Sequence, residues 1–416
     1  MKRLIKSAAA VILTLMTAVM GIVGYYDAVL PEHYYVSGGL DTSLMCLFDV
    51  ELTPKQEAIE AYNEDVSASS TDGEGIDGEL KLWGVIPIKD AKISRSEAKC
   101  LIPGGSPVGI KLLTDGVMVV KVQDVAEGEC PAVKAGLAEG DNVISADGVR
   151  LHSSTQLSEI IEASGGRDIA LEVSRDGRIF TTVLTPIYSE KECAYKGGLW
   201  IRDSSAGVGM LTFTDPETGS YGALGHPISD CDTLKTLPLG SGEIVDVTIT
   251  GHEKGERGCP GELFGTFVSG LASGSIIVNC EQGVFGKMTY SSRADAIPIA
   301  FKSEVKQGKA KILTTISGNK PEEFDIEIEK LTISSACKTK NIVIKVTDPR
   351  LLSATGGIVQ GMSGSPIIQD GKLVGAVTHV FVSDPTRGFV NDPTKGYGIF
   401  IENMMEAAEG AADKAA

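Results

Sequence analysis

The chain is poor in aromatic residues and in positive charge. Only 6% of its 416 residues are aromatic, and 38 Lys and Arg stand against 55 Asp and Glu, a formal net charge of −17 at pH 7. An acidic body repels phosphate backbones, which argues against nucleic acid as a partner. What is abundant is Gly (49) and Pro (17). This composition predicts many turns and a mainly β protein of two or three domains.

Metal-binding motifs are also missing. None of the eight cysteines forms a C-x-x-C pair, and there is no H-E-x-x-H. We therefore expect neither a metal site nor a cofactor. Disulfides would be permitted in an exported chain, but scattered buried thiols fit the even count equally well, and the connectivity cannot be read from the sequence.

One long uncharged run is present, from Ser7 to Tyr26, and Lys2, Arg3 and Lys6 precede it. About 20 apolar residues are needed to cross the hydrocarbon core. Basic residues in front of such a run keep the N-terminus in the cytoplasm. Residues 1–26 are therefore predicted to be a transmembrane anchor that leaves the rest of the chain on the extracytoplasmic face. A cleaved signal peptide is the alternative.

Residues 27–105 read as a juxtamembrane segment of undefined structure. Within it, residues 66–78 (VSASSTDGEGIDG) are small, polar and Gly-rich, which predicts a flexible linker. The stretch from Leu80 to Ile88 then alternates in the manner of a strand.

Residues 106–186 carry the stretch P-A-x-x-A-G-L-x-x-G-D, which begins at Pro131, between short strand patterns and one amphipathic helix. This region resembles a PDZ domain, an α+β module. The resemblance implies a groove in which a peptide adds as an extra strand. The backbone of Gly109, Ile110, Lys111 and Leu112 would hold that peptide, and the chain's own N-terminal segment is one expected ligand. A β-rich spacer without a ligand is the alternative.

The strongest chemical signal is the hexamer Gly361-Met362-Ser363-Gly364-Ser365-Pro366. It fits the G-x-S-G-x-P elbow of trypsin-like peptidases, in which glycines let the backbone turn tightly so that the serine hydroxyl points outward. The amides of Gly361 and Ser363 would then form an oxyanion hole. A hairpin pattern follows the serine, and its second strand would line the substrate pocket. Alternation places Thr378 and His379 on opposite faces of that strand, so only one of them is expected to point into the pocket.

A serine nucleophile needs a base, and the chain has five histidines. His226 is the best candidate because it ends a predicted hairpin in the first half of residues 187–416, where a double β-barrel places its general base. The third member of a triad is not settled by spacing. Asp348 follows an apolar strand, Asp203 is a further candidate, and Asp230 lies close to His226 in sequence.

The chain resembles the SpoIVB (stage IV sporulation protein B) peptidases of endospore-forming bacteria. The residues that carry the resemblance are Gly225-His226, 347–352 (TDPRLL), 357–369 (GIVQGMSGSPIIQ) and 375–382 (GAVTHVFV). It implies Ser363, His226 and Asp348 as the catalytic residues and Thr378 as functionally sensitive. Two departures stand out: Pro227 replaces the usual glycine after the histidine, and a DPT-x-G loop occurs twice.

The family implies a role that composition does not. Its members act in the space between the two forespore membranes. There they cleave themselves and a membrane-bound sporulation regulator, which activates the processing of a late sigma factor. The leading hypothesis is therefore a membrane-anchored regulatory serine endopeptidase. The alternatives are a PDZ adaptor with an inactive peptidase-like domain and a quality-control protease of broad specificity.

Overall fold

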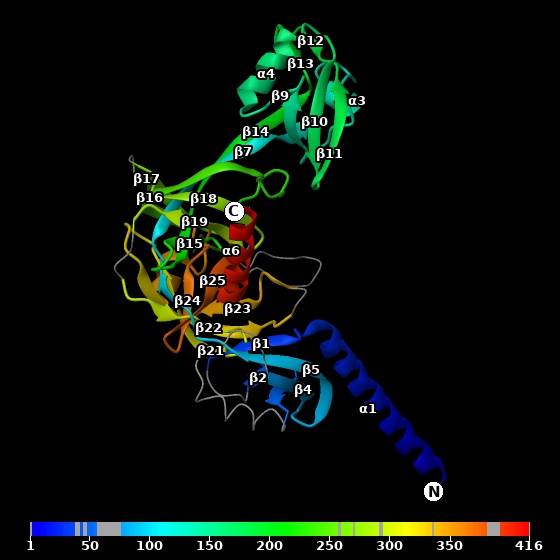
Figure 1. Ribbon diagram of the computed structural model, residues 1–416, viewed down its shortest axis with the longest axis vertical. Helices are drawn as coiled ribbons and strands as arrows, with labels where there is room; N and C mark the ends of the chain where they lie inside the picture. Colours follow the sequence, from blue (N-terminus) through cyan, green and yellow to red (C-terminus); the bar gives the residue numbers. More distant parts are fainter. Residues whose placement is uncertain are drawn as a thin grey trace.

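The structure is a computed structural model that describes residues 2–37, 42–44, 48–55, 76–256, 259–268, 271–290, 294–334, 337–380 and 392–415. Figure 1 shows a helix and a compact β-rich module at opposite ends of the molecule, with β-barrels between them.

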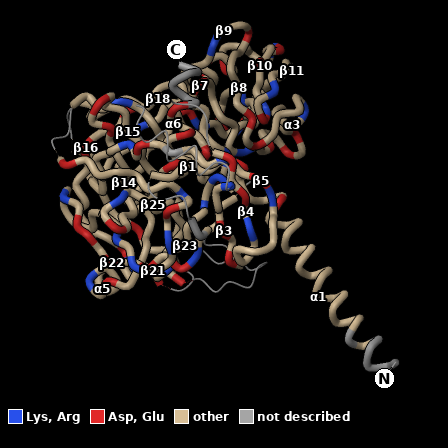
Figure 2. The backbone as a smooth tube through the Cα atoms, turned by 60° about the horizontal axis from the view of Figure 1, so that its bottom comes forward, with Lys and Arg blue, Asp and Glu red and all other residues tan. Residues whose placement is uncertain are grey.

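The chain begins with the helix α1 (Lys2–Val29). Its stretch Ala9–Val29 is long and apolar enough to cross a membrane, a property that a signal sequence shares, and only 6% of its most apolar window is buried. Figure 2 shows α1 projecting from the body, and its stretch from Ser7 to Tyr26 contains no charged residue. This agrees with the predicted anchor.

A five-stranded sheet follows the helix, in the order β1-β5-β4-β3-β2. Its strands are β1 (His33–Val36), β2 (Thr42–Leu44), β3 (Val50–Pro54), β4 (Ile76–Leu82) and β5 (Ile86–Arg95). The described residues of the juxtamembrane segment thus form a sheet. Residues 76–78 of the expected linker start β4, whereas 66–75 lie outside the described residues. The stretch Leu80–Ile88 is a hairpin and not one strand, because the chain reverses at Trp83 and Gly84, which both have positive φ.

The PDZ-like module packs short strands around its helices. It contains the second half of β7 (Pro107–Val122), α3 (Pro131–Lys134), β8 (Asn142–Ala146), β9 (Val149–Arg150), α4 (Ser154–Ala163), β10 (Ile169–Arg175) and β11 (Arg178–Leu184). Leu157 and Ile161 lie on the apolar face of α4 and are buried in a hydrophobic core that belongs to the PDZ-like module. Ser153 caps this helix by accepting a hydrogen bond from the Gln156 N–H at 3.2 Å. A small hairpin, β12 (Ile187–Ser189) and β13 (Ala194–Lys196), follows the module.

Six strands close the first barrel in the order β7-β16-β18-β19-β15-β14, because β14 also pairs with β7. They are β7, β14 (Leu199–Thr214), β15 (Ser220–Ala223), β16 (Leu239–Glu253), β18 (Gly274–Cys280) and β19 (Gly283–Met288). The short strands β6 (Cys100–Pro103), β17 (Glu262–Phe267) and β20 (Ile297–Pro298) extend the sheet. The first half of β7 belongs to this barrel. The predicted domain boundary between residues 186 and 187 therefore separates β7 from β14 and β16, with which it pairs.

The second barrel is closed by β21-β22-β23-β26-β25-β24. These are β21 (Gly308–Thr314), β22 (Glu322–Leu331), β23 (Ile342–Val346), β24 (Pro366–Gln369), β25 (Lys372–Val380) and β26 (Lys395–Phe400), with helices α5 (Pro349–Thr355) and α6 (Ile401–Ala415). Strict alternation along β22 sends Phe324, Ile326 and Ile328 into the core. The expected double β-barrel is therefore confirmed.

Two strands of 16 residues each, β7 and β14, join the PDZ-like module to the first barrel (Figure 1). They pair with each other along most of their length, from Leu199 opposite Val122 to Met210 opposite Pro107. The two parts of the molecule are therefore joined by a paired ribbon, which register shifts interrupt at Trp200/Ile201 and Arg202/Ser204, and not by a single unpaired segment.

The PDZ-like motif ends in an aspartate whose carboxylate is buried. Asp141 is 1% exposed and forms hydrogen bonds at 2.6 and 2.7 Å with the guanidinium of Arg175. We expect Arg175→Ala to cost the module about 3 kcal/mol, because it leaves a buried carboxylate unpaired. Hydrogen exchange should show faster exchange of the β8 and β10 amides. The matched control is Lys235→Ala, which removes the more exposed pair with Asp176; equal effects of both variants would contradict the expectation.

Candidate active site

The hexamer around Ser363 forms a tight turn between α5 and β24. Gly361 and Gly364 have φ of +92° and +95°, which side-chain-bearing residues rarely adopt. A Cβ on Gly364 would also lie 2.0 Å from the carbonyl oxygen of Met210. Glycine at this position thus allows the second barrel to approach the first.

The first barrel holds this turn directly. The Met210 N–H donates a 2.7 Å hydrogen bond to the carbonyl of Ser363, and the Thr212 hydroxyl donates one of 2.8 Å to the carbonyl of Gly364. Thr212 is fully buried. Both bonds join β14 to the turn, so Ser363 lies at the contact between the two barrels.

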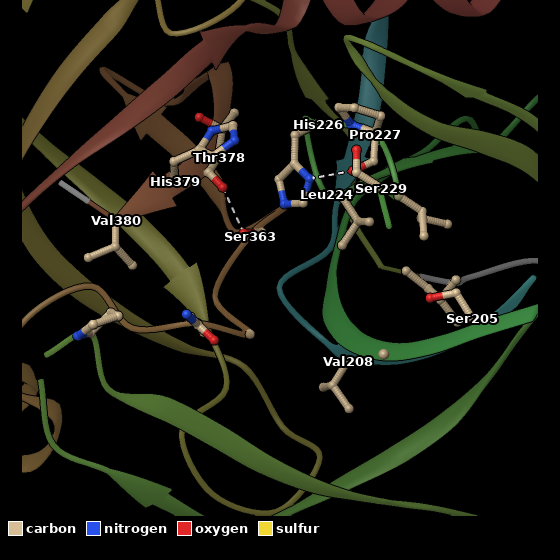
Figure 3. Close-up of a pocket in the computed structure, with 16 residues that line it drawn as sticks. Ser205, Val208, Leu224, His226, Pro227, Ser229, Ser363, Thr378, His379 and Val380 are labelled. Carbon is tan, nitrogen blue, oxygen red and sulfur yellow. Dashed lines mark hydrogen bonds between the residues drawn. The ribbon is translucent and has the colours of Figure 1, made fainter. Parts of the chain in front are cut away.

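Ser363 lines a cavity of about 360 Å³, which Figure 3 shows in close-up. His226, Thr378, His379 and Gly361 line the same cavity. The structure therefore brings together the predicted nucleophile, the predicted base, one oxyanion-hole glycine and both pocket candidates, from segments more than 130 residues apart.

The Ser363 hydroxyl donates a 2.7 Å hydrogen bond to the carbonyl oxygen of Thr378 (Figure 3). In a reactive arrangement the hydroxyl would instead face a base, and catalytic hydrogen bonds commonly form only when substrate is bound. The amides of Met362, Gly364 and Ser365 are bonded to backbone carbonyls. Gly361 and Ser363 line the cavity, as an oxyanion hole requires.

His226 follows β15, where Leu224 and Gly225 with φ of +67° and +70° turn the chain toward Ser363. Its Nδ1 lies 2.8 Å from the carbonyl oxygen of Pro227. A carbonyl only accepts, so Nδ1 carries the proton and Nε2 is left as the basic nitrogen. Proline at 227 thus coexists with an ordered imidazole, because its carbonyl supplies the orienting partner.

An asparagine that no sequence motif singles out holds the segment after His226. The side chain of Asn279, on β18, accepts from the Ile228 N–H at 2.8 Å and donates to the carbonyls of Ile228 and Leu237 at 3.0 Å each. All three bonds link positions more than 40 residues apart, so no local pattern could have indicated them.

His379 packs beside His226, with ring centroids 4.9 Å apart and planes tilted by 40°. Burial, followed by the nearby His226 and Lys340, lowers the pKa of His379 to about 3, so the ring is neutral at physiological pH. Its Nδ1 is buried and has no hydrogen-bond partner among the described residues. The cavity wall beside the serine is thus polar but uncharged.

Thr378 and His379 both border the cavity, although only one of them was expected to point into it. A register shift between Val377 and His379, where β25 pairs with β26, breaks the alternation, and both residues line the cavity. The Thr378 hydroxyl is already used by the carbonyl of Tyr397 at 3.2 Å, and its methyl group faces Gly225.

Asp348 is not in the cavity. Its carboxylate caps α5 by accepting from the Arg350 N–H at 2.8 Å, and it also binds the Arg350 guanidinium at 2.9 and 3.2 Å. The hydrogen bond to Arg350 is the main cause that holds the pKa of Asp348 below its ordinary value. The position that a triad aspartate would take at Nδ1 of His226 is taken here by the Pro227 carbonyl.

The other candidate acids are also engaged elsewhere. Asp203 accepts two hydrogen bonds from Ser154 at the start of α4. Asp230 and Asp232 flank Cys231, and the three ligand atoms lie within 4.8 Å of one another. The guanidinium of Arg202 pairs with both carboxylates, so this cluster is an ion-pair site and not a vacant metal cage. The seven cysteines within the described ranges are free thiols.

The prediction that residues 109–112 form the peptide-binding strand is wrong. Residues 109–112 pair on one side with β14, where Gly109 lies opposite Val208, and on the other with β16, where it lies opposite Val245. A peptide cannot add to a strand whose two edges are both occupied. These residues are barrel wall, and Ile110 lines the cavity of Ser363.

A second cleft, of about 520 Å³, lies between α4 and the start of β14. Ser158, Ile161 and Glu162 come from the helix, and Leu199, Trp200 and Ile201 from the strand. Over this stretch β14 pairs with β7 on one side, and the helix lies on the other. This is the strand-and-helix geometry of a peptide groove, made by a strand that follows the PDZ-like region in sequence.

Two β-barrels with a serine turn and a histidine at their contact, joined to a PDZ-like module, define a serine peptidase of the trypsin-like class. Comparison with known families agrees: the model of the SpoIVB peptidase S55 family matches residues 193–405, and that of the PDZ domain matches residues 106–184. The chain belongs to the SpoIVB peptidase S55 family.

Two individual relatives each match about a fifth of the chain. A Bartonella henselae protein with the provisional name of a zinc metalloprotease is 37% identical over 82 residues, which are 20% of this chain. The chain spans 22% of the length of that relative. The PDZ domain of an SdrC-like protein from Listeria monocytogenes is 22% identical, with a TM-score of 0.19, and the match covers 21% of this chain and 87% of that structure.

The burial of the His226 imidazole leads to a prediction about the pH dependence of kcat/KM. Desolvation is the main cause that lowers the pKa of His226 below its ordinary 6.5. If Nε2 must be free to accept a proton, activity is lost only as pH falls through this lowered pKa. We expect the acid limb of kcat/KM to have its midpoint below pH 6.5. The His379→Gln variant is the control; His379 is neutral over this range, so the limb should not move. A midpoint at or above 6.5 would exclude His226 as a buried base.

Proposed function

We propose that the chain is a membrane-anchored regulatory endopeptidase in which Ser363 is the nucleophile and His226 the general base. The observation that carries the proposal is the convergence of both residues in one cavity at the contact of the two barrels. The chemistry is acyl transfer from a peptide bond to the Ser363 hydroxyl and then to water.

The residues in the cavity have defined tasks in this reaction. The Ser363 hydroxyl turns from the Thr378 carbonyl and attacks the scissile carbonyl while Nε2 of His226 accepts its proton. The amides of Gly361 and Ser363 stabilise the resulting oxyanion. His226 then gives the proton to the leaving amine, and the second half-reaction repeats the steps with water. The Pro227 carbonyl holds the imidazole in the tautomer that these steps need.

Protein substrates follow from the family and from the PDZ module. The anchor places the peptidase near a membrane surface, on the extracytoplasmic side if Lys2, Arg3 and Lys6 remain in the cytoplasm. By the family resemblance the substrate is a membrane-bound sporulation regulator in the space between the forespore membranes, and its cleavage activates processing of a late sigma factor. Self-cleavage near the N-terminus belongs to the same proposal.

Substitution of the two central residues tests the chemistry. We expect Ser363→Ala and His226→Ala each to lower kcat by about 10⁶-fold, with no further loss in the double variant, because the two residues act as a unit. Ser363→Ala should also abolish labelling by a fluorophosphonate probe and stop self-cleavage. Self-processing by purified Ser363→Ala protein would exclude Ser363.

Asp348→Asn is the informative companion variant. Asn caps helices as well as Asp does, so the variant loses chiefly the pair with Arg350. We expect turnover within about tenfold of the parent, the scale of a lost 1 to 2 kcal/mol. A drop of about 10⁴-fold with the fold intact would instead assign Asp348 the role of the triad acid.

The cleft between α4 and β14 is proposed as the peptide site of the PDZ module. Chain segments 27–65 and free C-terminal peptides are the first ligands to test. The full chain is required, because a fragment that ends near residue 187 lacks β14. In a Trp83→Phe protein, Trp200 is the only tryptophan and lines the cleft. We expect a saturable change in its emission as peptide is added.

The control for the cleft is Ser158→Arg, which adds bulk from α4 without touching the barrels. It should abolish the emission change and preserve probe labelling of Ser363. An unchanged titration in Ser158→Arg would place the peptide elsewhere on the chain.

A further inference from the structure

The five-stranded sheet is attached to the part of α1 that would lie inside a membrane. The uncharged run Ser7–Tyr26 has 20 residues, and a helix of that length spans about 30 Å, the thickness of the hydrocarbon core. Yet Phe48, in the segment between β2 and β3 of this sheet, already borders the same small pocket as Ala18 of α1. Among the described residues, only the stretch of the uncharged run before Ala18, roughly 16 Å of helix, has no contact with the sheet side of the molecule.

Phe48 makes this contact. It lines a small apolar pocket together with residues of one helix face, namely Ala18, Gly21, Ile22, Tyr25 and Tyr26. Its backbone N–H donates a 3.0 Å hydrogen bond to the Tyr26 hydroxyl. At the next residue of the helix, the Lys89 ammonium donates to the carbonyl of Asp27 at 2.9 Å. The sheet is thus fixed along the last third of the helix and not merely connected to its end.

The hairpin turn beside Phe48 is unusual. Trp83 and Gly84 have φ of +55° and +68°, and the Val85 N–H donates to the Leu82 carbonyl at 3.2 Å. A two-residue turn with both φ values positive favours Asn-Gly, and a bulky side chain at its first position is strained. Local preference therefore does not explain a tryptophan here, and such exceptions concentrate at functional sites.

The turn is also apolar and exposed. Trp83 is 44% exposed and Val85 78% exposed. The Trp83 ring packs edge-on against Phe48 at 6.0 Å, and Tyr25 on the helix is 61% exposed. An apolar group of this kind on a water-facing surface is unfavourable, but Trp and Tyr are enriched where a protein meets the headgroup level of a bilayer.

We propose that this aromatic turn, formed by Trp83, Val85, Phe48 and Tyr25, inserts into the headgroup and glycerol level of the bilayer that α1 crosses. Lipid contact at that depth reconciles the length of the apolar run with the attachment of the sheet at Ala18. It also gives the exposed Trp83 an environment that suits an amphipathic ring.

The lipid partner is a neutral interface and not an anionic one. Glu51 lies close to the turn, since a Cβ on Gly84 would be 2.6 Å from its carboxylate, and Asp49 accepts the Trp83 N–H through its carbonyl. The negative Glu51 side chain beside the turn would oppose anionic headgroups. Zwitterionic phospholipid is therefore sufficient.

The contact has a consequence for the peptidase. The sheet is joined to the second barrel by Glu304, which accepts from the Ser37 N–H at 3.0 Å and from the Lys372 ammonium at 2.9 Å. The Ser303 hydroxyl adds a 2.7 Å bond to the carbonyl of Tyr35. The sheet is then held at two points, by α1 and by the turn. This fixes the orientation of the barrels relative to the membrane, whereas a single helix would leave that orientation free.

The chain has two tryptophans, which permits a matched experiment. The Trp200→Phe protein reports on Trp83 alone, and the Trp83→Phe protein reports on Trp200, which is 56% exposed on the PDZ module. Both full-length proteins are reconstituted into phosphatidylcholine vesicles. Aqueous iodide and phosphatidylcholine brominated near the carbonyl end of its acyl chains are the two quenchers, and probe labelling of Ser363 confirms that each variant is folded.

We expect brominated lipid to quench Trp83 at least several-fold more than Trp200, and iodide to do the reverse. Replacing a third of the lipid by phosphatidylglycerol should leave both results unchanged. Equal access of iodide to the two tryptophans, without quenching by brominated lipid, would overturn the proposal. Quenching that requires the anionic lipid would overturn the neutral contact.

Discussion

The arrangement of the active site depends on two hydrogen bonds between the barrels. β14 of the first barrel donates from the Met210 N–H and the Thr212 hydroxyl to the carbonyls of Ser363 and Gly364 in the second. Neither barrel contains a complete site, since His226 belongs to one and Ser363 to the other. The bonds need a close approach that a Cβ at position 364 would block. A glycine that makes the turn possible therefore also makes the assembly possible.

The proposed base, His226, is oriented by a main-chain carbonyl and by a side-chain amide that binds the following segment, and not by a carboxylate. The Pro227 carbonyl fixes the tautomer of His226, and Asn279 fixes the segment that follows. Burial lowers the pKa of both cavity histidines, so the site is neutral at physiological pH. In a partly enclosed, uncharged cavity the few oriented donors act more strongly on developing charge than they would in bulk water.

The long strands β7 and β14 place the peptide cleft and the cavity on one ribbon. β14 contributes Trp200 and Ile201 to the cleft and, a few residues later, Ser205 and Val208 to the cavity. At the other end of the molecule, the sheet that packs on α1 is hydrogen-bonded to the second barrel. The proposed peptide cleft, the cavity of Ser363 and the apolar helix are thus joined through paired strands and hydrogen bonds.

The sequence by itself determined the features that rest on local pattern. The apolar run predicts α1, alternation predicts the barrel strands, and the glycines of the hexamer identify Ser363, because each needs only near neighbours. Only the tertiary structure decided which distant groups meet. It paired both edges of residues 109–112, left Asp348 as a helix cap, and brought Asn279 to His226, because strand pairing and side-chain contacts between remote segments leave no periodic trace in the chain. The bulge at Val377 shows the same limit, since one extra residue cancels the alternation from which a side-chain direction is inferred.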